Sequence, residues 1–185
     1  MHPYGYTAFA FDLTPDLNYS SVNVLAVRVD NSAQPNSRWY SGSGIYRHVR
    51  VLVTDPTHVA HWGVFVTTPE ATSASAKVSI RTRVVNESSV VAQVTVETVV
   101  LDTRGNRIGI AQSKLSIEPG KEEEAPQEIG VLNPGLWSPE SPTLYHAVST
   151  IRCDGKVIDQ VPTPFGIRSL AWSAEKGLLL NGKPI

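Results

Sequence analysis

Apolar and polar residues alternate with a period of two over long stretches of this chain, and that pattern is typical of β-strands with one buried face. Residues 76–85 (AKVSIRTRVV) alternate throughout, as do residues 91–100, and residues 23–31 carry a similar run. The predicted inward face of the first run consists of Val78, Ile80, Thr82 and Val84. We find no sustained helical period. The pattern therefore predicts an all-β fold built from half-buried antiparallel strands.

Turn-forming residues separate the alternating runs. The segments NESS (86–89), DTRGN (102–106), EPGK (118–121) and CDGK (153–156) combine Gly, Asn, Asp and Pro, which favour tight turns. A further hairpin signal lies at Asn181–Gly182. Strands at spacings of about ten residues, joined by such turns, indicate a β-sandwich.

The sequence divides into three pieces, residues 1–55, 57–168 and 169–185. The first is too short for a complete sandwich, and the last is too short to fold independently. The middle piece has about seven candidate strands, which is the number in a complete immunoglobulin-like unit.

Two local motifs carry narrower predictions. The segment LTPDLNY predicts one helical turn, with Thr14 as its cap and Pro15 at the first helical position. The triplets beginning at Asn18 and Asn86 match the N-glycosylation acceptor pattern, which often arises by chance.

Composition excludes several classes of function. The net charge is −1, which argues against a nucleic-acid-binding face. No apolar run approaches the length needed to span a membrane, so we expect no membrane partner. The single cysteine, Cys153, allows no internal disulfide, and no Cys/His metal spacing exists. We therefore predict neither a metal site nor a cofactor.

Six motifs in order resemble the family 2 glycoside hydrolases, especially their bacterial β-galactosidase-like members. They are HPYGYTAFAFDLTPDL, NVLAVRVDN, SRWYSGSGIYRHV, LWSPESPTLY, FGIRSLAWS and KGLLLNGKPI. The family layout is a jelly-roll sugar-binding domain, an immunoglobulin-like sandwich and a (β/α)₈ catalytic barrel. The resemblance implies that residues 1–55 end the jelly roll, residues 57–168 form the sandwich, and residues 169–185 lead into an absent barrel.

That layout has a chemical consequence. Members of the family use two glutamates on barrel strands, and retaining hydrolysis needs two carboxyl groups about 5 Å apart. The resemblance places both beyond residue 185, and the glutamates present here match none of the family's catalytic motifs. We therefore expect this chain to be inactive alone, as a non-catalytic segment of an enzyme that removes terminal β-linked sugars from oligosaccharides. β-Glucuronidases and β-mannosidases share the layout, so the sugar stays open.

The loop NSRWYSGSGIYRHV (36–49) supports two interpretations. In the first it contacts substrate beside the barrel mouth. Aromatic rings suit the C–H faces of a pyranose, and Arg or Asn side chains suit its hydroxyls. The candidate substrate-binding residues are Asn36, Arg38, Trp39 and Tyr40. In the second the loop packs an interface between domains. Some relatives carry an acidic residue near this point, but Asp30 lies further back here, which disfavours a metal role.

One rival from a different class remains. A stand-alone immunoglobulin-like module for carbohydrate binding or adhesion would explain the middle piece, but not the truncated jelly-roll piece or the terminal NGKPI. For the enzyme, the expected partners are the oligosaccharide substrate, the catalytic barrel and a possible second copy in a homo-oligomer. A periplasmic or secreted location is favoured over the cytoplasm for a full-length bacterial enzyme.

Overall fold

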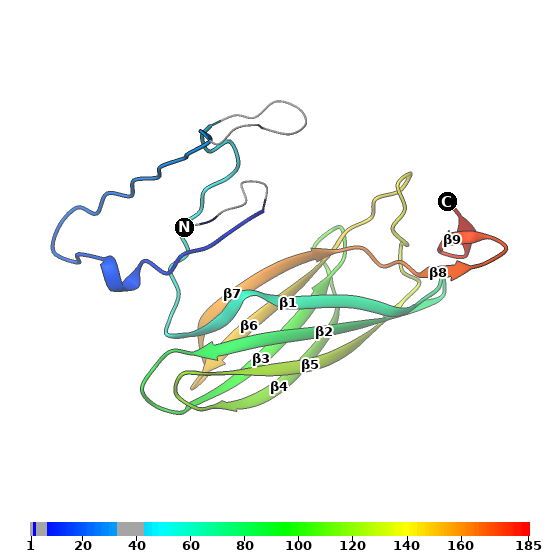
Figure 1. The fold of residues 1–185 in the computed structure, drawn as a ribbon. Helices are drawn as coiled ribbons and strands as arrows, with labels where there is room; N and C mark the ends of the chain where they lie inside the picture. The colour runs from blue at the N-terminus through cyan, green and yellow to red at the C-terminus, as the bar shows by residue number, and fades with distance from the viewer. Residues whose placement is uncertain (1, 3–6, 33–42) are drawn as a thin grey trace. The chain divides into compact units, whose positions relative to one another are not determined.

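The computed structural model describes residues 2, 7–32 and 43–185 (Figure 1). The chain divides into two compact units, Met1–Val51 and Leu52–Ile185, and each is described by itself. No helix among the described residues is long and apolar enough to cross a membrane.

The second unit contains a seven-stranded antiparallel β-sandwich, which confirms the predicted all-β, immunoglobulin-like fold (Figure 1). One sheet has the order β1-β2-β5 and the other the order β4-β3-β6-β7. In chain order the strands are β1 (Thr57–Ala71), β2 (Ser75–Asn86), β3 (Ala92–Leu101), β4 (Arg107–Ile117), β5 (Lys121–Leu132), β6 (Tyr145–Cys153) and β7 (Lys156–Phe165). Because β2 and β3 lie in different sheets, as do β4 and β5, the chain passes twice between the layers before β6.

The core lies between the two sheets and is made by the alternating faces expected from the sequence. All four predicted inward residues of β2, from Val78 to Val84, are fully buried. They meet residues of the facing sheet such as Val96, Val100 and Ile151, which are also fully buried. Each such aliphatic side chain contributes about 1.5–3 kcal/mol relative to an exposed position. Packing therefore fixes the register of these strands, because a slip of one residue would expose the whole face.

Three hydroxyl groups interrupt this apolar interior without destabilising it. The Ser149 hydroxyl lies 3.1 Å from the Thr98 hydroxyl and 3.2 Å from that of Thr82, and all three residues are fully buried. Since a buried hydroxyl costs little when it finds a hydrogen-bond partner, the three groups satisfy one another across the two sheets.

Asn86, at the end of β2, is a structural hub. Its side chain is fully buried, and its amide nitrogen donates to the carbonyl oxygens of Val90 (2.8 Å) and Ile117 (2.9 Å). Its side-chain oxygen accepts hydrogen bonds from the Thr57 hydroxyl (3.1 Å) and the Ser88 hydroxyl (2.7 Å). The glycosylation pattern at this position is therefore incidental, because a fully buried amide is not accessible to a glycan.

The corner before β6 is packed by an aromatic residue. Tyr145 is 6% exposed, and its hydroxyl accepts a 2.8 Å hydrogen bond from the Gly135 N–H. A tyrosine at the start of this strand that bonds back to the preceding loop is a recurrent feature of immunoglobulin-like folds. Trp137, half-buried on the same loop, lies so close to Gly166 that a Cβ there would sit 2.7 Å from the indole Cγ.

A small three-stranded sheet follows the sandwich, with the order β10-β9-β8 (Figure 1). Its strands are β8 (Leu170–Ser173), β9 (Gly177–Leu180) and β10 (Lys183–Pro184). Asn181 and Gly182 join β9 to β10 with φ values of 51° and 77°, so the hairpin turn predicted there is confirmed.

The first unit has little regular structure among its described residues. A single turn of 3₁₀ helix covers Thr14–Asp16, as predicted, but the cap was wrong. Leu13 occupies the cap position, and the Asp12 carboxylate accepts the Thr14 N–H at 2.9 Å. Residues 7–32 and 43–55 carry no assigned strand, so the run at 23–31 has no ladder partner among the described residues. Its assignment to a jelly roll stays a prediction.

Candidate functional site

The four candidate substrate-binding residues, Asn36, Arg38, Trp39 and Tyr40, lie outside the residues that the structure describes. The described remainder of that loop is exposed to solvent. There the Arg47 guanidinium lies 5.6 Å from the centre of the Tyr46 ring. The substrate-binding assignment therefore stays a prediction.

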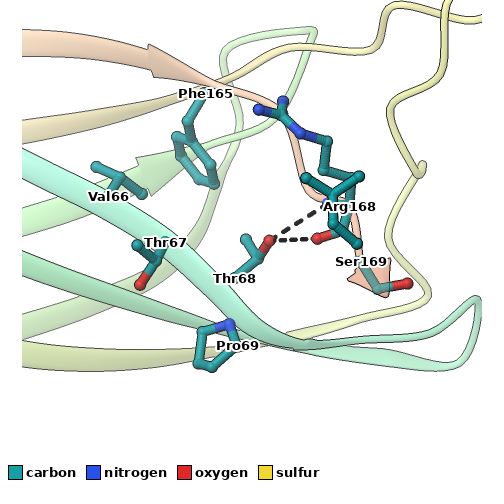
Figure 2. Close-up of a pocket in the computed structure, with 9 residues that line it drawn as sticks. Val66, Thr67, Thr68, Pro69, Phe165, Arg168 and Ser169 are labelled. Carbon is teal, nitrogen blue, oxygen red and sulfur yellow. Dashed lines mark hydrogen bonds between the residues drawn. The ribbon is translucent and has the colours of Figure 1, made fainter. Parts of the chain in front are cut away.

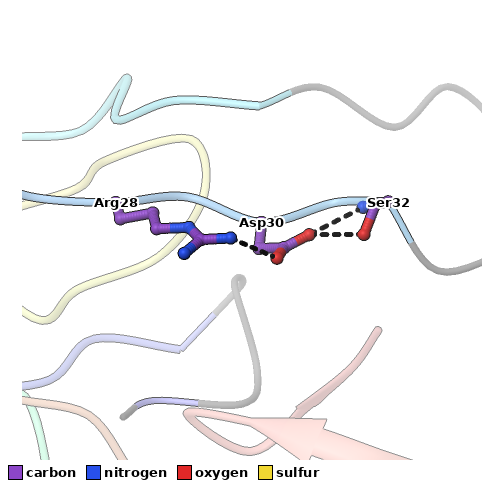
Figure 3. Close-up of polar contacts among 3 residues, drawn as sticks. All are labelled: Arg28, Asp30 and Ser32. Atoms are coloured by element: carbon purple, nitrogen blue, oxygen red, sulfur yellow. Dashed lines mark hydrogen bonds and ion pairs between the residues drawn. The ribbon is translucent and has the colours of Figure 1, made fainter.

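Asp30 is held in a local network of polar contacts (Figure 3). One carboxylate oxygen accepts hydrogen bonds from the Ser32 hydroxyl (2.6 Å) and the Ser32 N–H (3.1 Å), and the other pairs with the Arg28 guanidinium at 3.2 Å. The Ser32 hydroxyl, followed by the Ser32 N–H, lowers the pKa of the Asp30 carboxyl below its ordinary value. These contacts order the backbone at residues 28–32.

No group of three or more His, Cys, Asp or Glu side chains is arranged to hold a metal ion in the described parts of the chain. The glutamates of β5 instead face basic residues of β2 in three exposed ion pairs. These are Lys77–Glu128 (3.0 Å), Arg81–Glu124 (3.6 Å) and Arg83–Glu122 (3.6 Å). Exposed pairs of this kind stabilise a fold weakly, so this face of the sheet is a solvated one.

A shallow hollow of about 370 Å³ lies where β1 meets the segment that leaves β7 (Figure 2). It is lined by Val66, Thr67, Thr68, Pro69, Phe165, Gly166, Arg168, Ser169 and Leu170. At its base the Thr68 hydroxyl donates to the Arg168 carbonyl oxygen at 2.7 Å and accepts the Arg168 N–H at 3.3 Å. A side chain thus replaces the backbone ladder at this point. Sequence analysis missed Thr68, because its partner lies 100 residues further along the chain.

Asn181 completes the connection between the sandwich and the small sheet. Its amide nitrogen donates to the Trp137 carbonyl oxygen at 3.0 Å, and its side-chain oxygen accepts the Ser169 N–H at 3.0 Å. The Arg168 guanidinium lies over the Trp137 ring, 4.9 Å from its centre. We call Thr68, Trp137, Arg168, Ser169 and Asn181 the junction cluster. It fastens the small sheet to the end of the sandwich.

One face of the small sheet is apolar and largely exposed. Leu170 pairs with Leu180, and Trp172 pairs with Leu178, so the four side chains share a face. Leu180 is 6% exposed, whereas Leu170 is 61%, Leu178 39% and Trp172 76% exposed. We call these four residues the hairpin ladder. An exposed apolar group on a fastened element is typical of a surface that contacts another part of a protein.

The fold and this site together define an immunoglobulin-like β-module with a short, apolar-faced sheet fixed to one end. The profile of the family described as "Glycosyl hydrolases family 2" matches residues 57–168. The chain belongs to this family.

Individual relatives agree with that assignment. The chain is 43% identical to the β-galactosidase BoGH2A of Bacteroides ovatus over 99% of its own length and 22% of the relative's. It is 32% identical to a β-glucuronidase of Bacteroides fragilis over 98% of its own length and 28% of the relative's. The crystal structure of a family 2 member from Bacteroides cellulosilyticus, 41% identical, superimposes with a TM-score of 0.94 over 98% of this chain and 25% of that one. The chain thus spans between 22% and 28% of the length of these proteins.

Proposed function

We propose that this chain is a non-catalytic segment of a β-galactosidase-like glycoside hydrolase that removes terminal β-linked sugars from oligosaccharides. Its role is to hold a catalytic domain in place and to border that domain's active site. Family membership supports this proposal, as does the high identity to a β-galactosidase along almost the whole chain. The chain covers only a small share of the length of such proteins, which favours a structural rather than a catalytic role.

The main structural observation behind this proposal is the exposed apolar face of the hairpin ladder. Three of its four side chains face solvent, although they stand on an element that the junction cluster fixes to the sandwich. Covering such a face with another surface stabilises the protein by about 25 cal/mol per Å² of apolar area buried. We propose that the remainder of the longer enzyme, including its catalytic barrel, covers the ladder.

A pair of variants tests this role in two backgrounds. In the full-length enzyme, Trp172→Ser should lower the melting temperature and the turnover of nitrophenyl β-D-galactoside, because it removes apolar area from the covered face. In the 185-residue chain it should leave the melting temperature almost unchanged, because Trp172 is 76% exposed there. Leu132→Ser, at a residue that is 81% exposed on β5, is the control and should be silent in both. If Trp172→Ser is silent in the full-length enzyme as well, the ladder is not a covered face.

A direct assay tests the absence of catalysis. The 185-residue chain should release no nitrophenol from nitrophenyl β-D-galactoside, because retaining hydrolysis needs a carboxyl pair that the proposal places elsewhere. The full-length enzyme under the same conditions is the positive control. Turnover by the chain that disappears on mutating one of its own glutamates would contradict the proposal.

The loop residues form the finer part of the proposal. We propose that Asn36, Arg38, Trp39 and Tyr40 contact the substrate, with the rings against the sugar face and the polar groups on its hydroxyls. In the full-length enzyme, Arg38→Ala and Trp39→Ala should then raise KM or lower kcat/KM while the melting temperature changes little. A fall in melting temperature with unchanged kinetics would instead assign these side chains to packing between domains.

A further inference from the structure

Strand β1 contains a long bulge near its start, in which several residues lie opposite one residue of β2. Its pairing with β2 passes from Val59 opposite Val84 to Val64 opposite Thr82. Residues 60–63 therefore lie opposite Arg83 on the neighbouring strand, so β1 holds three more residues than β2 over this interval. A bulge of this kind redirects side chains away from the sheet.

The backbone at the bulge is unfavourable for the residue it holds. Trp62 has φ 52°, in the left-handed region that a bulky side chain rarely adopts. The other three non-glycine residues with positive φ in the described chain are Asn133, Asp154 and Asn181, types that tolerate this conformation. A tryptophan here costs stability that an asparagine would not, and such local strain is concentrated at functional sites.

Gly63 makes the conformation possible. A Cβ at this position would lie 2.6 Å from the Ala60 carbonyl oxygen and 2.9 Å from the Arg83 carbonyl oxygen. No other residue fits so close to two backbone atoms without a shift. The absence of a Cβ therefore lets the backbone at Gly63 lie against both carbonyl oxygens, which permits the tight path of the bulge beside Trp62.

The bulge carries two neighbouring aromatic side chains, Trp62 and His61, whose rings are tilted to each other. Trp62 is 70% exposed, and the His61 ring lies beside it with the ring centres 4.5 Å apart and the planes 32° from parallel. β1 is the edge strand of its sheet, and near its start the Val59 N–H donates to the Asp159 carboxylate of β7 at 2.8 Å. The neighbouring strand β2 carries Arg81 and Arg83, which pair with glutamates of β5.

We propose that Trp62 and His61 form a second carbohydrate-binding site, on the immunoglobulin-like sandwich itself. An indole face matches the C–H face of a pyranose ring, and an imidazole can donate to or accept from its hydroxyl groups. The polar groups of the adjacent strand suit a hydroxyl-rich ligand better than an apolar protein surface. The choice of a galactose-containing oligosaccharide as ligand rests on the proposed function. This site anchors the chain of a large substrate and takes no part in bond cleavage.

Titration of the ¹⁵N-labelled 185-residue chain with β-1,4-linked galactotetraose, followed through the tryptophan indole N–H signals, tests this site. The Trp62 signal should shift saturably at millimolar sugar. Trp62→Asn removes the ring but suits positive φ, so it should weaken binding about tenfold or more while leaving the melting temperature equal or higher. Trp172→Ala, at another exposed tryptophan, is the matched control and should leave binding unchanged.

Three results would overturn the site. They are no saturable shift, a shift that survives Trp62→Asn, and a fall in melting temperature for Trp62→Asn, which would make the ring a packing residue. Loss of self-association in Trp62→Asn without any sugar response would assign the surface to a second copy of the chain instead. Turnover of nitrophenyl β-D-galactoside by the full-length enzyme is measured separately and tests the proposed function, so the two can fail independently.

Discussion

The two units of this chain contain similar sequence patterns with different outcomes. Residues 76–85 and 23–31 both alternate apolar and polar side chains. In the sandwich, Val78 and Ile80 are fully buried. In the first unit, Leu25 is 60% and Val27 54% exposed. The difference lies in the availability of partner strands.

Alternation alone sets which side chains share a face, but it does not supply a surface to cover that face. In the sandwich, β2 finds β1 and β5 as antiparallel neighbours and a second sheet opposite. The run at 23–31 has no such neighbours among the described residues. If it belongs to a jelly roll, as the family resemblance predicts, its partner strands lie in the longer enzyme. Substitutions of equal chemistry in the two units should therefore have unequal effects in this chain.

The largest contrast should come from a matched pair of asparagines. Asn86→Ala removes a buried amide that satisfies two carbonyl oxygens and two hydroxyl groups, so it should destabilise the sandwich by about 3 kcal/mol. Asn18→Ala, at an exposed position, should change stability by less than ~0.5 kcal/mol. Urea unfolding followed by circular dichroism measures both. Equal effects would show that the two units are equally integrated.

A matched pair of valines tests packing without hydrogen bonds. Val96→Ala opens a cavity at a fully buried position and should cost about 2 kcal/mol. Val27→Ala, at a position 54% exposed, should have almost no effect in this chain. The same urea titration compares them. A large effect of Val27→Ala would mean that the first unit has a core that its described structure does not show.

Sequence patterns predicted the sandwich well because its determinants are local. The inward face of β2 follows from a period of two, and the Asn181–Gly182 turn follows from two residues that tolerate positive φ. The missed features depend on distant partners. The Thr68–Arg168 pair joins residues 100 positions apart, and the Trp62 bulge depends on backbone atoms of Arg83. No pattern within a short window encodes such contacts.

The candidate site residues were even harder to predict from the sequence than the fold. The composition of the loop at 36–49 suggested sugar contacts through chemistry alone, and the four residues chosen lie outside the described chain. The hairpin ladder could have been found, because Leu170 and Trp172 alternate and Leu178 and Leu180 do too. The exposure of these side chains could not have been predicted, because it depends on how the junction cluster orients the small sheet.

A pair of tyrosines gives a smaller contrast. Tyr145→Phe deletes the hydroxyl that accepts the Gly135 N–H and leaves that donor unpaired in a partly buried loop, so it should cost about 1 kcal/mol. Tyr19→Phe, at a position 81% exposed, should be silent. Thermal unfolding of both variants measures the difference. If Tyr145→Phe is silent too, water replaces the tyrosine hydroxyl at the corner.

The smallest contrast concerns two aspartates that each accept hydrogen bonds from residues close to them in the sequence. Asp102 accepts the side-chain amide and the N–H of Asn106 and the N–H of Arg104 in the turn between β3 and β4. The Asn106 side chain, and then its N–H, lower the pKa of the Asp102 carboxyl. The Ser32 hydroxyl has the same effect on the pKa of Asp30. The difference is that the Asp102 turn joins two paired strands.

Since the pKa of Asp102 is lower in the folded state than in the unfolded chain, its stabilising effect is present above the unfolded pKa of about 3.9. The effect is lost as the pH falls through the folded pKa. Asp102→Ala should therefore lower the melting temperature slightly at neutral pH, and the gap to the parent chain should close in strong acid, once the folded-state carboxyl is protonated. Asp30→Ala should show no such gap, because its turn closes no hairpin of the sandwich. A difference in melting temperature for Asp102→Ala that persists in acid would assign the loss of stability to turn geometry rather than to the charged carboxylate. An equal difference for Asp30→Ala would show that the first unit unfolds cooperatively with the second.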